Sequence, residues 1–338
     1  TGPTLHMGHA IPLKKLGELQ KMGHKIILLI GDFTAMIGDP DKLSVRKPLT
    51  RAEVLSNCKL YKKQASMFLN FSGTNKAELK FNSKWLAPMT FDDILKVSSK
   101  VTVDQILKRD MFQQRMKENR PLYLHEFMYP VMQGYDSVAM NVDAEIGGND
   151  QMFNMLTGRD LMKEMLGKDK FVITMKLLVD TSGNKMGKTT GNGVSLTDNE
   201  FEKFGKVMSW TDGMILSGFE LCTKFSLEQI AQIKKELEGG ANPRDIKIRL
   251  AKEIVAIYHS KELADKALEN FINTFKKGGI PDDVLEIIAK VGDELISILI
   301  KAGVVKSKTD WRRLVDEGAV SNVETGEKIT DVSFKIKE

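Results

Sequence analysis

At the start of the chain, apolar residues first recur with helical spacing and then form an uninterrupted run. Apolar side chains recur every third position over residues 10–22, which is the spacing of one helix face, and Gly23 then provides a helix stop. Residues 25–30, KIILLI, form an apolar run typical of a buried parallel strand. These elements predict part of a βαβ unit whose first strand would precede Thr1. Because the chain opens without Met, we expect a further N-terminal segment that supplies this strand.

The same two patterns alternate up to about residue 200. Thr50 and Glu53 have the spacing of a capping box at a helix start, and the region around 81–95 is mixed. Helices are expected over 50–71, 101–117, 124–136 and 152–166, and strands over 142–151 and 171–179. Alternating helices and buried strands predict an α/β domain over 1–200 with a doubly wound, Rossmann-like parallel sheet.

Helical patterning alone continues over 201–280. Ser226 and Gln229 have capping-box spacing, and Pro243 suits the first position of a further helix. The amphipathic stripes that follow need no ligand to explain them, so they predict a small all-α domain. A stretch at 278–281 with Gly and Pro has the composition of a linker.

The last segment, 285–338, predicts a separate α+β unit. A helix is expected over 307–318, and two apolar stretches then flank Thr325-Gly326 as a hairpin. Basic side chains gather near this helix: Lys306, Lys308, Arg312 and Arg313. Such a cluster would hold phosphates, although a basic cluster is more often only a solvated face.

Composition narrows the class of protein. The chain has 338 residues and a formal charge of +5, enough length for several domains and a balance that permits a nucleic-acid partner. Cys58 and Cys222 lie far apart with no metal-ligand spacing, which fits a reducing cytosol and predicts neither zinc nor a disulfide. No apolar run approaches the roughly 18 residues of a membrane span, so we expect a cytoplasmic protein without a membrane partner.

Two short motifs favour a bound nucleotide. His6 and His9 bracket Gly8 at a predicted helix start, where two imidazoles share one face and the glycine permits close approach of a ribose. Thr1 adds a hydroxyl nearby. A helix start with two surface histidines explains this motif at least as well.

The second motif, DTSGNKMGKTT, follows the strand expected over 171–179. Lys185 and Lys188 on a glycine-bearing loop suit the charge that develops on a departing pyrophosphate. A P-loop is excluded, because Gly183 precedes Gly187 by one residue too few.

Polar side chains interrupt three further apolar stretches. Tyr129, Gln133 and Asp136 share one stripe of a predicted helix, which indicates either a binding site or a polar outer face. In GGNDQ, Gly147 and Gly148 permit close approach of a nucleoside, Asp150 would hold ribose hydroxyls and Gln151 would reach a carbonyl. A tight turn explains that motif equally well. Asp39 would pair with an ammonium group, although Gly-Asp-Pro is also a plain turn.

Together and in this order, HMGH, KMGKT and the three polar stretches resemble class I aminoacyl-tRNA synthetases of the bacterial tyrosyl type, over essentially the whole chain. The commoner second motif is KMSKS, from which Gly187 and Thr189 depart in a way familiar from that group. Asn149 stands where the group has serine. The resemblance implies activation of tyrosine by ATP with Mg²⁺, transfer to the 3′ end of tRNA(Tyr), and a homodimer formed through the middle of the catalytic domain.

The resemblance also implies a role for each matching residue, with no metal site of the protein's own. It assigns phosphate and transition-state contacts to Thr1, His6, His9, Lys185, Lys188 and Thr189. It assigns ATP to Gly8, Gly147, Gly148, Asp150 and Lys188. Tyrosine falls to Thr34, Asp39, Tyr129, Gln133, Asp136 and Gln151, with Asp136 at the hydroxyl. The C-terminal unit resembles an S4-like RNA-binding module, which assigns RNA to Lys306, Lys308, Arg312 and Arg313.

Two alternatives remain open from the sequence. The tryptophan-specific sister enzyme shares the fold and both signatures, but Asp136 and the S4-like unit argue against it. A non-catalytic RNA-binding protein on a synthetase scaffold would not need intact phosphate-binding residues. We therefore expect a tyrosine–tRNA ligase.

Overall fold

The computed structural model describes residues 4–37, 49–180, 183, 186, 193–276, 287–305, 307–316, 318–322 and 327–336. The chain forms two compact units, Thr1–Asn199 with Lys206–Ile254, and Glu200–Gly205 with Val255–Glu338. The domain limits expected at about 200 and 280 remain a prediction. No helix in the described ranges is both long and apolar enough to cross a membrane.

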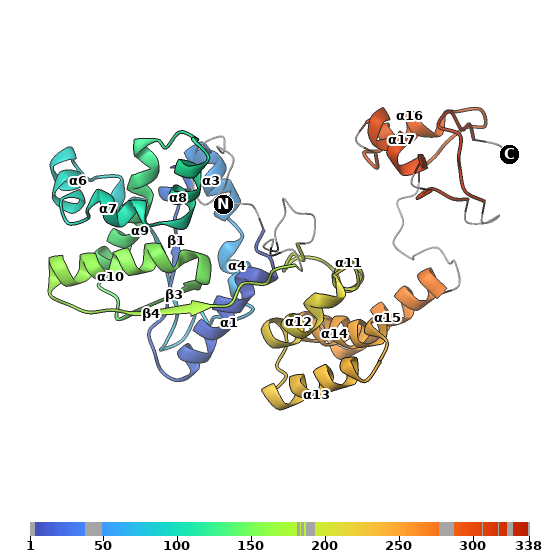
Figure 1. The fold of residues 1–338 in the computed structure, drawn as a ribbon. Coiled ribbons are helices and arrows are strands. Elements are labelled where there is room, and N and C mark those ends of the chain that lie inside the picture. Colours follow the sequence, from blue (N-terminus) through green and yellow to red (C-terminus); the bar gives the residue numbers. More distant parts are fainter. Residues whose placement is uncertain are drawn as a thin grey trace. The chain divides into compact units, whose positions relative to one another are not determined.

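Parallel strand pairs form the centre of the first unit. β1 (Ile27–Ile30) pairs with β2 (Glu78–Phe81), and β3 (Ala144–Gly148) pairs with β4 (Phe171–Met175). The strands expected over 25–30, 142–151 and 171–179 are confirmed, each shorter than expected. β2 was not predicted, and only its last residue, Phe81, falls in the stretch 81–95 whose pattern is mixed. Figure 1 shows helix α10 (Met152–Leu166) running beside β4.

The first helix, α1 (Met7–Lys21), starts at the HMGH motif. The His6 side chain accepts a hydrogen bond from the Gly8 backbone N–H and thereby caps the helix. Gly23 has φ +97°, which is the left-handed conformation expected of a helix stop. Met22 belongs to the expected apolar face but is 73% exposed, because it lies beyond the last helical residue.

Two of the expected long helices are interrupted. The stretch 50–71 contains α3 (Arg51–Cys58) and α4 (Tyr61–Ala65), and 101–117 contains α7 (Val103–Leu107) and α8 (Asp110–Lys117). The second break occurs at Arg109, whose ψ of 126° is extended. The capping box of Thr50 and Glu53 is present at α3. Between these pairs lie α5 (Ser83–Leu86) and α6 (Phe91–Ser98).

Helices α9 (Leu124–Met140) and α10 pack closely against each other. At their crossing, a Cβ on Gly134 would lie 3.1 Å from the Gly158 backbone N. Beside the crossing, the buried Lys170 Nζ lies 2.5 Å from Glu145 Oε2 and donates to Ser137 Oγ at 2.8 Å. This contact joins α9 to β3 and to the residue that precedes β4.

The rest of the first unit is helical. It contains α12 (Ile215–Cys222) and α13 (Leu227–Glu238), while α11 (Glu200–Met208) and α14 (Pro243–Tyr258) contribute to both units. The capping box of Ser226 and Gln229 is confirmed, and α14 begins at Pro243 as expected.

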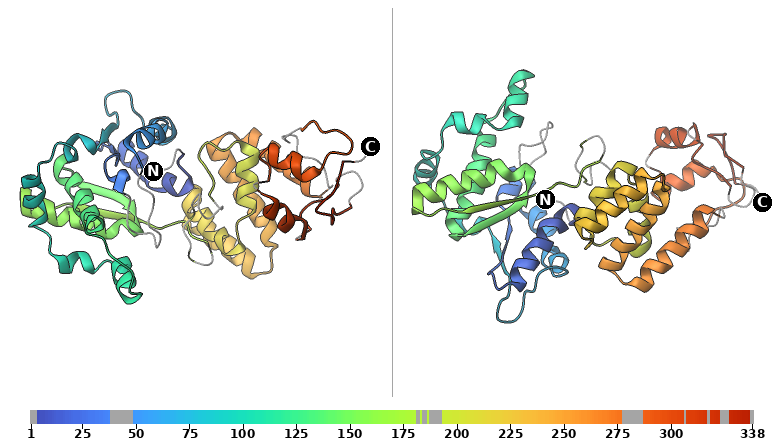
Figure 2. Two further views of the ribbon diagram at one scale, coloured as in Figure 1. Left: turned by 90° about the horizontal axis from the view of Figure 1, so that it is seen from above. Right: turned by 60° about the horizontal axis from the view of Figure 1, so that its bottom comes forward.

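The second unit contains α15 (Lys261–Lys276), α16 (Leu295–Lys301) and α17 (Lys308–Asp316). Trp311 packs in a small core with α16 and donates its indole N–H to the Val332 carbonyl at 2.8 Å. The two red helices stay together with the C-terminal segment in all three views (Figures 1 and 2). Ser321 bridges Lys328 in antiparallel fashion, which supports the expected hairpin; Thr325-Gly326 lies outside the described residues.

Candidate active site

The parallel register of β1 and β2 brings their following residues to one edge of the sheet. Thr34 begins the short helix α2 (Thr34–Ile37) after β1, and Asn82 follows β2 directly. The Asn82 Nδ2 donates to Thr34 Oγ1 at 3.1 Å, and Asn82 Oδ1 accepts from the Phe33 backbone N–H at 2.9 Å. Both polar side chains are buried. These hydrogen-bonded, buried polar side chains line the β1–β2 edge, which we call the polar wall.

Asp136 of α9 completes the wall. One carboxylate oxygen accepts the indole N–H of Trp85 at 2.8 Å, and the other accepts from Asn82 Nδ2 at 3.2 Å. Because Asp136 is only 4% exposed, the alternative of a polar outer face is wrong for this residue. Burial raises the pKa of Asp136 to about 7, against the two hydrogen bonds, which lower the pKa; Glu145 and Asp32 raise it further.

The wall contains residues that the sequence analysis missed as site residues. Asn82 and Trp85 lie in the mixed stretch, directly after β2 and within α5, two elements of four residues each. Asp32 also belongs there, because its carboxylate accepts the Ser83 backbone N–H at 2.9 Å. The only available signal was an asparagine and a tryptophan three residues apart after an apolar stretch, which periodicity does not detect.

Tyr129, Gln133 and Asp136 all lie on α9, as expected, but they have different neighbours. Gln133 is half-buried and its Oε1 accepts from Asn154 Nδ2 of α10 at 2.9 Å. Tyr129 is also half-buried. No direct hydrogen bond joins these two to Asp136 among the contacts described. Asp136 therefore belongs to the β1–β2 edge, while Gln133 belongs to the contact with α10.

The GGNDQ motif forms the end of β3 and the short 3-10 helix η1 (Asn149–Gln151). A Cβ on Gly148 would lie 2.5 Å from Asp150 Oδ1, and a Cβ on Gly147 would lie 3.1 Å from Met155 Sδ. A side chain at either position would therefore displace neighbouring side chains of the same chain. Gln151 donates to Asp150 Oδ2 at 3.1 Å, so the two polar side chains of the motif hold each other.

The HMGH turn is held by residues that follow the KMGKT motif. The Met7 backbone N–H donates to the Val194 carbonyl at 3.0 Å, and His6 forms an antiparallel bridge with Ser195. Met186, inside the second motif, is buried and its N–H donates to the Leu178 carbonyl at 2.9 Å. The HMGH turn is therefore fixed to the segment that follows the second motif. Thr1, Asp39, Lys185, Lys188, Thr189 and Lys306 lie outside the described residues.

Local hydrogen bonds orient both histidines. Nδ1 of His6 accepts from the Gly8 N–H, and Nδ1 of His9 accepts from the His6 N–H, each at 3.2 Å. The neutral ring of each then carries its proton on Nε2, where it is a donor suited to a phosphate oxygen. A Cβ on Gly8 would lie 3.0 Å from the His6 ring, so this glycine also preserves the cap.

The basic residues of α17 are only partly available for an anion. Lys308 and Arg312 are exposed, whereas Arg313 lies 2.8 Å from the Asp310 carboxylate. Exposed ion pairs of this kind are weak, about 0–1 kcal/mol, and a phosphate would compete with Asp310 for the guanidinium. The described geometry is that of an exposed basic helix face.

The amino-acid sequence matches one protein family and several curated relatives. Residues 1–276 match the model of the family described as tRNA synthetases class I (W and Y). A tyrosine–tRNA ligase from Carboxydothermus hydrogenoformans is 44% identical over 100% of this chain and 83% of its own length. Tyrosine–tRNA ligase 2 of Vibrio cholerae is 44% identical over 99% of this chain and 84% of its own.

Solved structures share the fold at low identity. The C-terminally truncated mitochondrial tyrosyl-tRNA synthetase of Coccidioides posadasii has a TM-score of 0.61 at 23% identity and covers 80% of each chain. The tyrosyl-tRNA synthetase of Archaeoglobus fulgidus, complexed with L-tyrosine, has a TM-score of 0.58 at 22% identity, covering 79% of this chain and 87% of that one.

Proposed function

The chain belongs to the class I tRNA synthetases of the tryptophan and tyrosine group, and we propose that Asp136 selects tyrosine in its pocket. Its activity is that of a tyrosine–tRNA ligase, an aminoacyl-tRNA synthetase that uses ATP. The fold is the α/β, Rossmann-like fold of this class. The assignments of individual residues that follow are proposals.

The observation that carries the proposal is the environment of Asp136. A buried carboxylate that already accepts from Trp85 and Asn82 is oriented as an acceptor. The phenol of tyrosine would donate a further hydrogen bond to it. A ring without the hydroxyl would leave this buried group incompletely paired, which is the effective way for a pocket to reject phenylalanine.

The remaining candidate residues are assigned to three parts of the tyrosine molecule. We assign Asp39, Tyr129 and Gln133 to the ammonium group and Gln151 to the carboxyl group. Thr34, hydrogen-bonded to Asn82, supports the phenol end.

ATP would bind across both signatures. Gly8 and the Gly147–Gly148 turn would face the nucleoside, with Asp150 at the ribose. His6 and His9 would donate from Nε2 to the phosphates, while Lys185, Lys188, Thr189 and Thr1 stabilise the departing pyrophosphate. Mg²⁺ would accompany ATP on its phosphates and add positive charge there.

The reaction needs position and charge rather than a covalent enzyme intermediate. The tyrosine carboxylate attacks the α-phosphate in line, the bond to the β-phosphate breaks, and pyrophosphate leaves with the electron pair. A terminal ribose hydroxyl of tRNA then attacks the carbonyl of the adenylate and releases AMP.

We also propose a cytoplasmic homodimer. Large apolar side chains of the middle region are exposed, a pattern typical of an interface. They are Phe91 (75%), Leu95 (54%), Val103 (63%) and Leu124 (79%). The all-α domain at 201–280 would face the anticodon arm of tRNA(Tyr). The S4-like unit at 285–338 would bind RNA through Lys306, Lys308, Arg312 and Arg313.

Amino-acid-dependent ATP–pyrophosphate exchange tests the proposal. Full-length protein should catalyse exchange with tyrosine and with neither phenylalanine nor tryptophan. Lys188→Ala should slow exchange by roughly 10²-fold or more with little change in tyrosine affinity, as for other preorganised charge donors. Unchanged turnover in that variant would contradict the assignment of Lys188, and exchange with tryptophan would contradict that of Asp136.

A further inference from the structure

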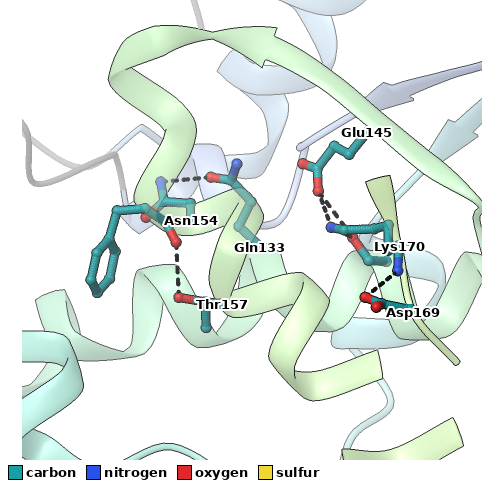
Figure 3. A network of polar contacts seen from close by, with 8 residues as sticks. Gln133, Glu145, Asn154, Thr157, Asp169 and Lys170 are labelled. Atoms are coloured by element: carbon teal, nitrogen blue, oxygen red, sulfur yellow. Dashed lines mark hydrogen bonds and ion pairs between the residues drawn. The ribbon is translucent and has the colours of Figure 1, made fainter. Parts of the chain in front are cut away.

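Asn154 connects the two glutamines that come from different motifs of the site. Its Nδ2 donates to Gln133 Oε1 of α9 at 2.9 Å (Figure 3). The same Nδ2 donates to Gln151 Oε1 of the GGNDQ turn at 3.0 Å. Asn154 is fully buried, at 0% exposure, in the first turn of α10. The Asn154 amide nitrogen thus donates one hydrogen bond to each of the two candidate tyrosine-binding glutamines.

The close crossing of α9 and α10 makes this connection possible. A Cβ on Gly158 would lie 3.2 Å from the Gly134 carbonyl oxygen, and a Cβ on Gly134 would lie 3.0 Å from a Leu161 methyl. Because neither glycine has a side chain, the helix backbones approach closely there. The short Asn154 side chain can then reach Gln133 from the facing helix.

The two ends of the Asn154 carboxamide are used unequally. Its Oδ1 is buried and has no hydrogen-bond partner among the described residues, whereas its Nδ2 has two. A buried acceptor without a partner is costly, and such groups in native proteins call for an explanation. The explanation we give is that the Nδ2 group must face both glutamines, because it donates the hydrogen bonds to their carbonyl oxygens.

We propose that Asn154 is a positioning residue for tyrosine, which acts by fixing the carboxamides of Gln133 and Gln151 before the substrate arrives. This inference rests on the proposed function. A free glutamine has several rotamers, and ordering each on binding weakens affinity. With the carbonyl oxygens of both side chains directed at one donor, tyrosine meets a site whose polar groups are already oriented.

The test compares Asn154→Ala and Asn154→Asp with Thr157→Val in full-length protein. Asn154→Ala removes the donor, and Asn154→Asp keeps the volume but offers only acceptors. Thr157 lies on the same helix and donates to the Phe153 carbonyl at 3.0 Å, so its variant loses a comparable hydrogen bond away from the glutamines.

Both Asn154 variants should raise the KM for tyrosine in pyrophosphate exchange roughly tenfold, as expected from freeing two side chains. The KM for ATP should stay within about twofold of its wild-type value, and Thr157→Val should leave both constants unchanged. In a Gln133→Ala background, Asn154→Ala should have a clearly smaller effect, because one of its two targets is gone.

A full tenfold effect in the Gln133→Ala background would overturn the proposal, as would a parallel rise in both KM values with a lower melting temperature. A crystal structure of Asn154→Ala gives a readout that does not depend on activity. Wild-type conformations of both glutamines there would also overturn it, whereas altered or mixed conformations would support it. Absence of exchange in the wild-type protein would instead refute the proposed function, and the crystal structure would still decide the positioning role.

Discussion

Replacing Trp85 by phenylalanine should shift the pH dependence of tyrosine binding to higher pH. The change keeps the aromatic ring and removes the indole N–H, which donates to the Asp136 carboxylate at 2.8 Å. A hydrogen bond to a charged group contributes about 1.5–3 kcal/mol. Since one pKa unit corresponds to about 1.36 kcal/mol, its loss should raise the pKa of Asp136 by roughly one to two units.

The sign follows from the proposed role of Asp136, in which the ionised carboxylate would accept the hydrogen bond of the phenol. The pKa of Asp136 is about 7, so about half of the wild-type protein holds the ionised acceptor at pH 7. With a pKa of roughly 8–9, about 1–10% would be ionised at that pH. The KM for tyrosine at pH 7 should therefore rise roughly 5- to 50-fold, and the difference from wild type should shrink as the pH approaches 9.

Pyrophosphate exchange measured from pH 6 to pH 9 checks this expectation. Trp210→Phe is the matched control, because the Trp210 indole N–H is buried and has no hydrogen-bond partner in the part of the chain that the structure describes. Its profile should coincide with that of the wild type. A Trp85→Phe variant whose KM is raised by the same factor at every pH would refute the reasoning, since the lost contact would then not act through ionisation of Asp136.

Three changes should affect stability in distinct ways. Lys170→Met removes the ion-pair partner of Glu145, which lies 2.5 Å away. Because the Glu145 side chain is 25% exposed, we expect the free energy of unfolding in urea to fall by about 2–3 kcal/mol, less than the 3–5 kcal/mol lost when a fully buried pair is broken. A loss below about 0.5 kcal/mol would show that water already screens the pair. Gly134→Ala should cost about 1–3 kcal/mol in the same assay, because the crowding of its Cβ against the facing backbone at 3.1 Å should exceed the roughly 1 kcal/mol that alanine gains over glycine in a helix. Unchanged stability would show that the crowding costs only about as much as that gain. Thr50→Ala removes a capping box and should lower protection from hydrogen exchange by about 1 kcal/mol in α3 alone; an equal loss throughout the unit would contradict a local effect.

Local signals in the sequence were sufficient for many elements. The capping boxes at Thr50 and Ser226 and the glycine stop at Gly23 act over a few residues, so the chain carries them wherever it folds. The strands β1, β3 and β4 were also predictable from continuous apolar runs. The break at Arg109 was not, because a single extended residue leaves the helical period of its flanks intact.

The candidate site was only partly predictable for a related reason. Asp136 was identified, but its burial depends on Asn82 and Trp85, which are more than fifty residues away in sequence. Asn82 lies between β2 and α5, and Trp85 lies on α5, and both of these elements are too short to show a period. Asn154 shows the same limit, since its contact with Gln133 depends on how closely α9 and α10 cross. Long-range packing therefore decides which polar residues meet.

The crossing at Gly134 and Gly158 also restricts how the pocket could be redesigned for unnatural amino acids. There is no side chain at that contact to shorten, and a Cβ on Gly134, which lies on the same helix as Gln133 and Asp136, would crowd the facing helix. On the proposed assignment of Asp136 to the phenol, room for a larger substituent on the substrate ring would have to come from the β1–β2 edge, where the Trp85 indole contacts Asp136. Trp85 is the side chain there with volume to give up, so a library for such substrates should vary Trp85 and keep both glycines.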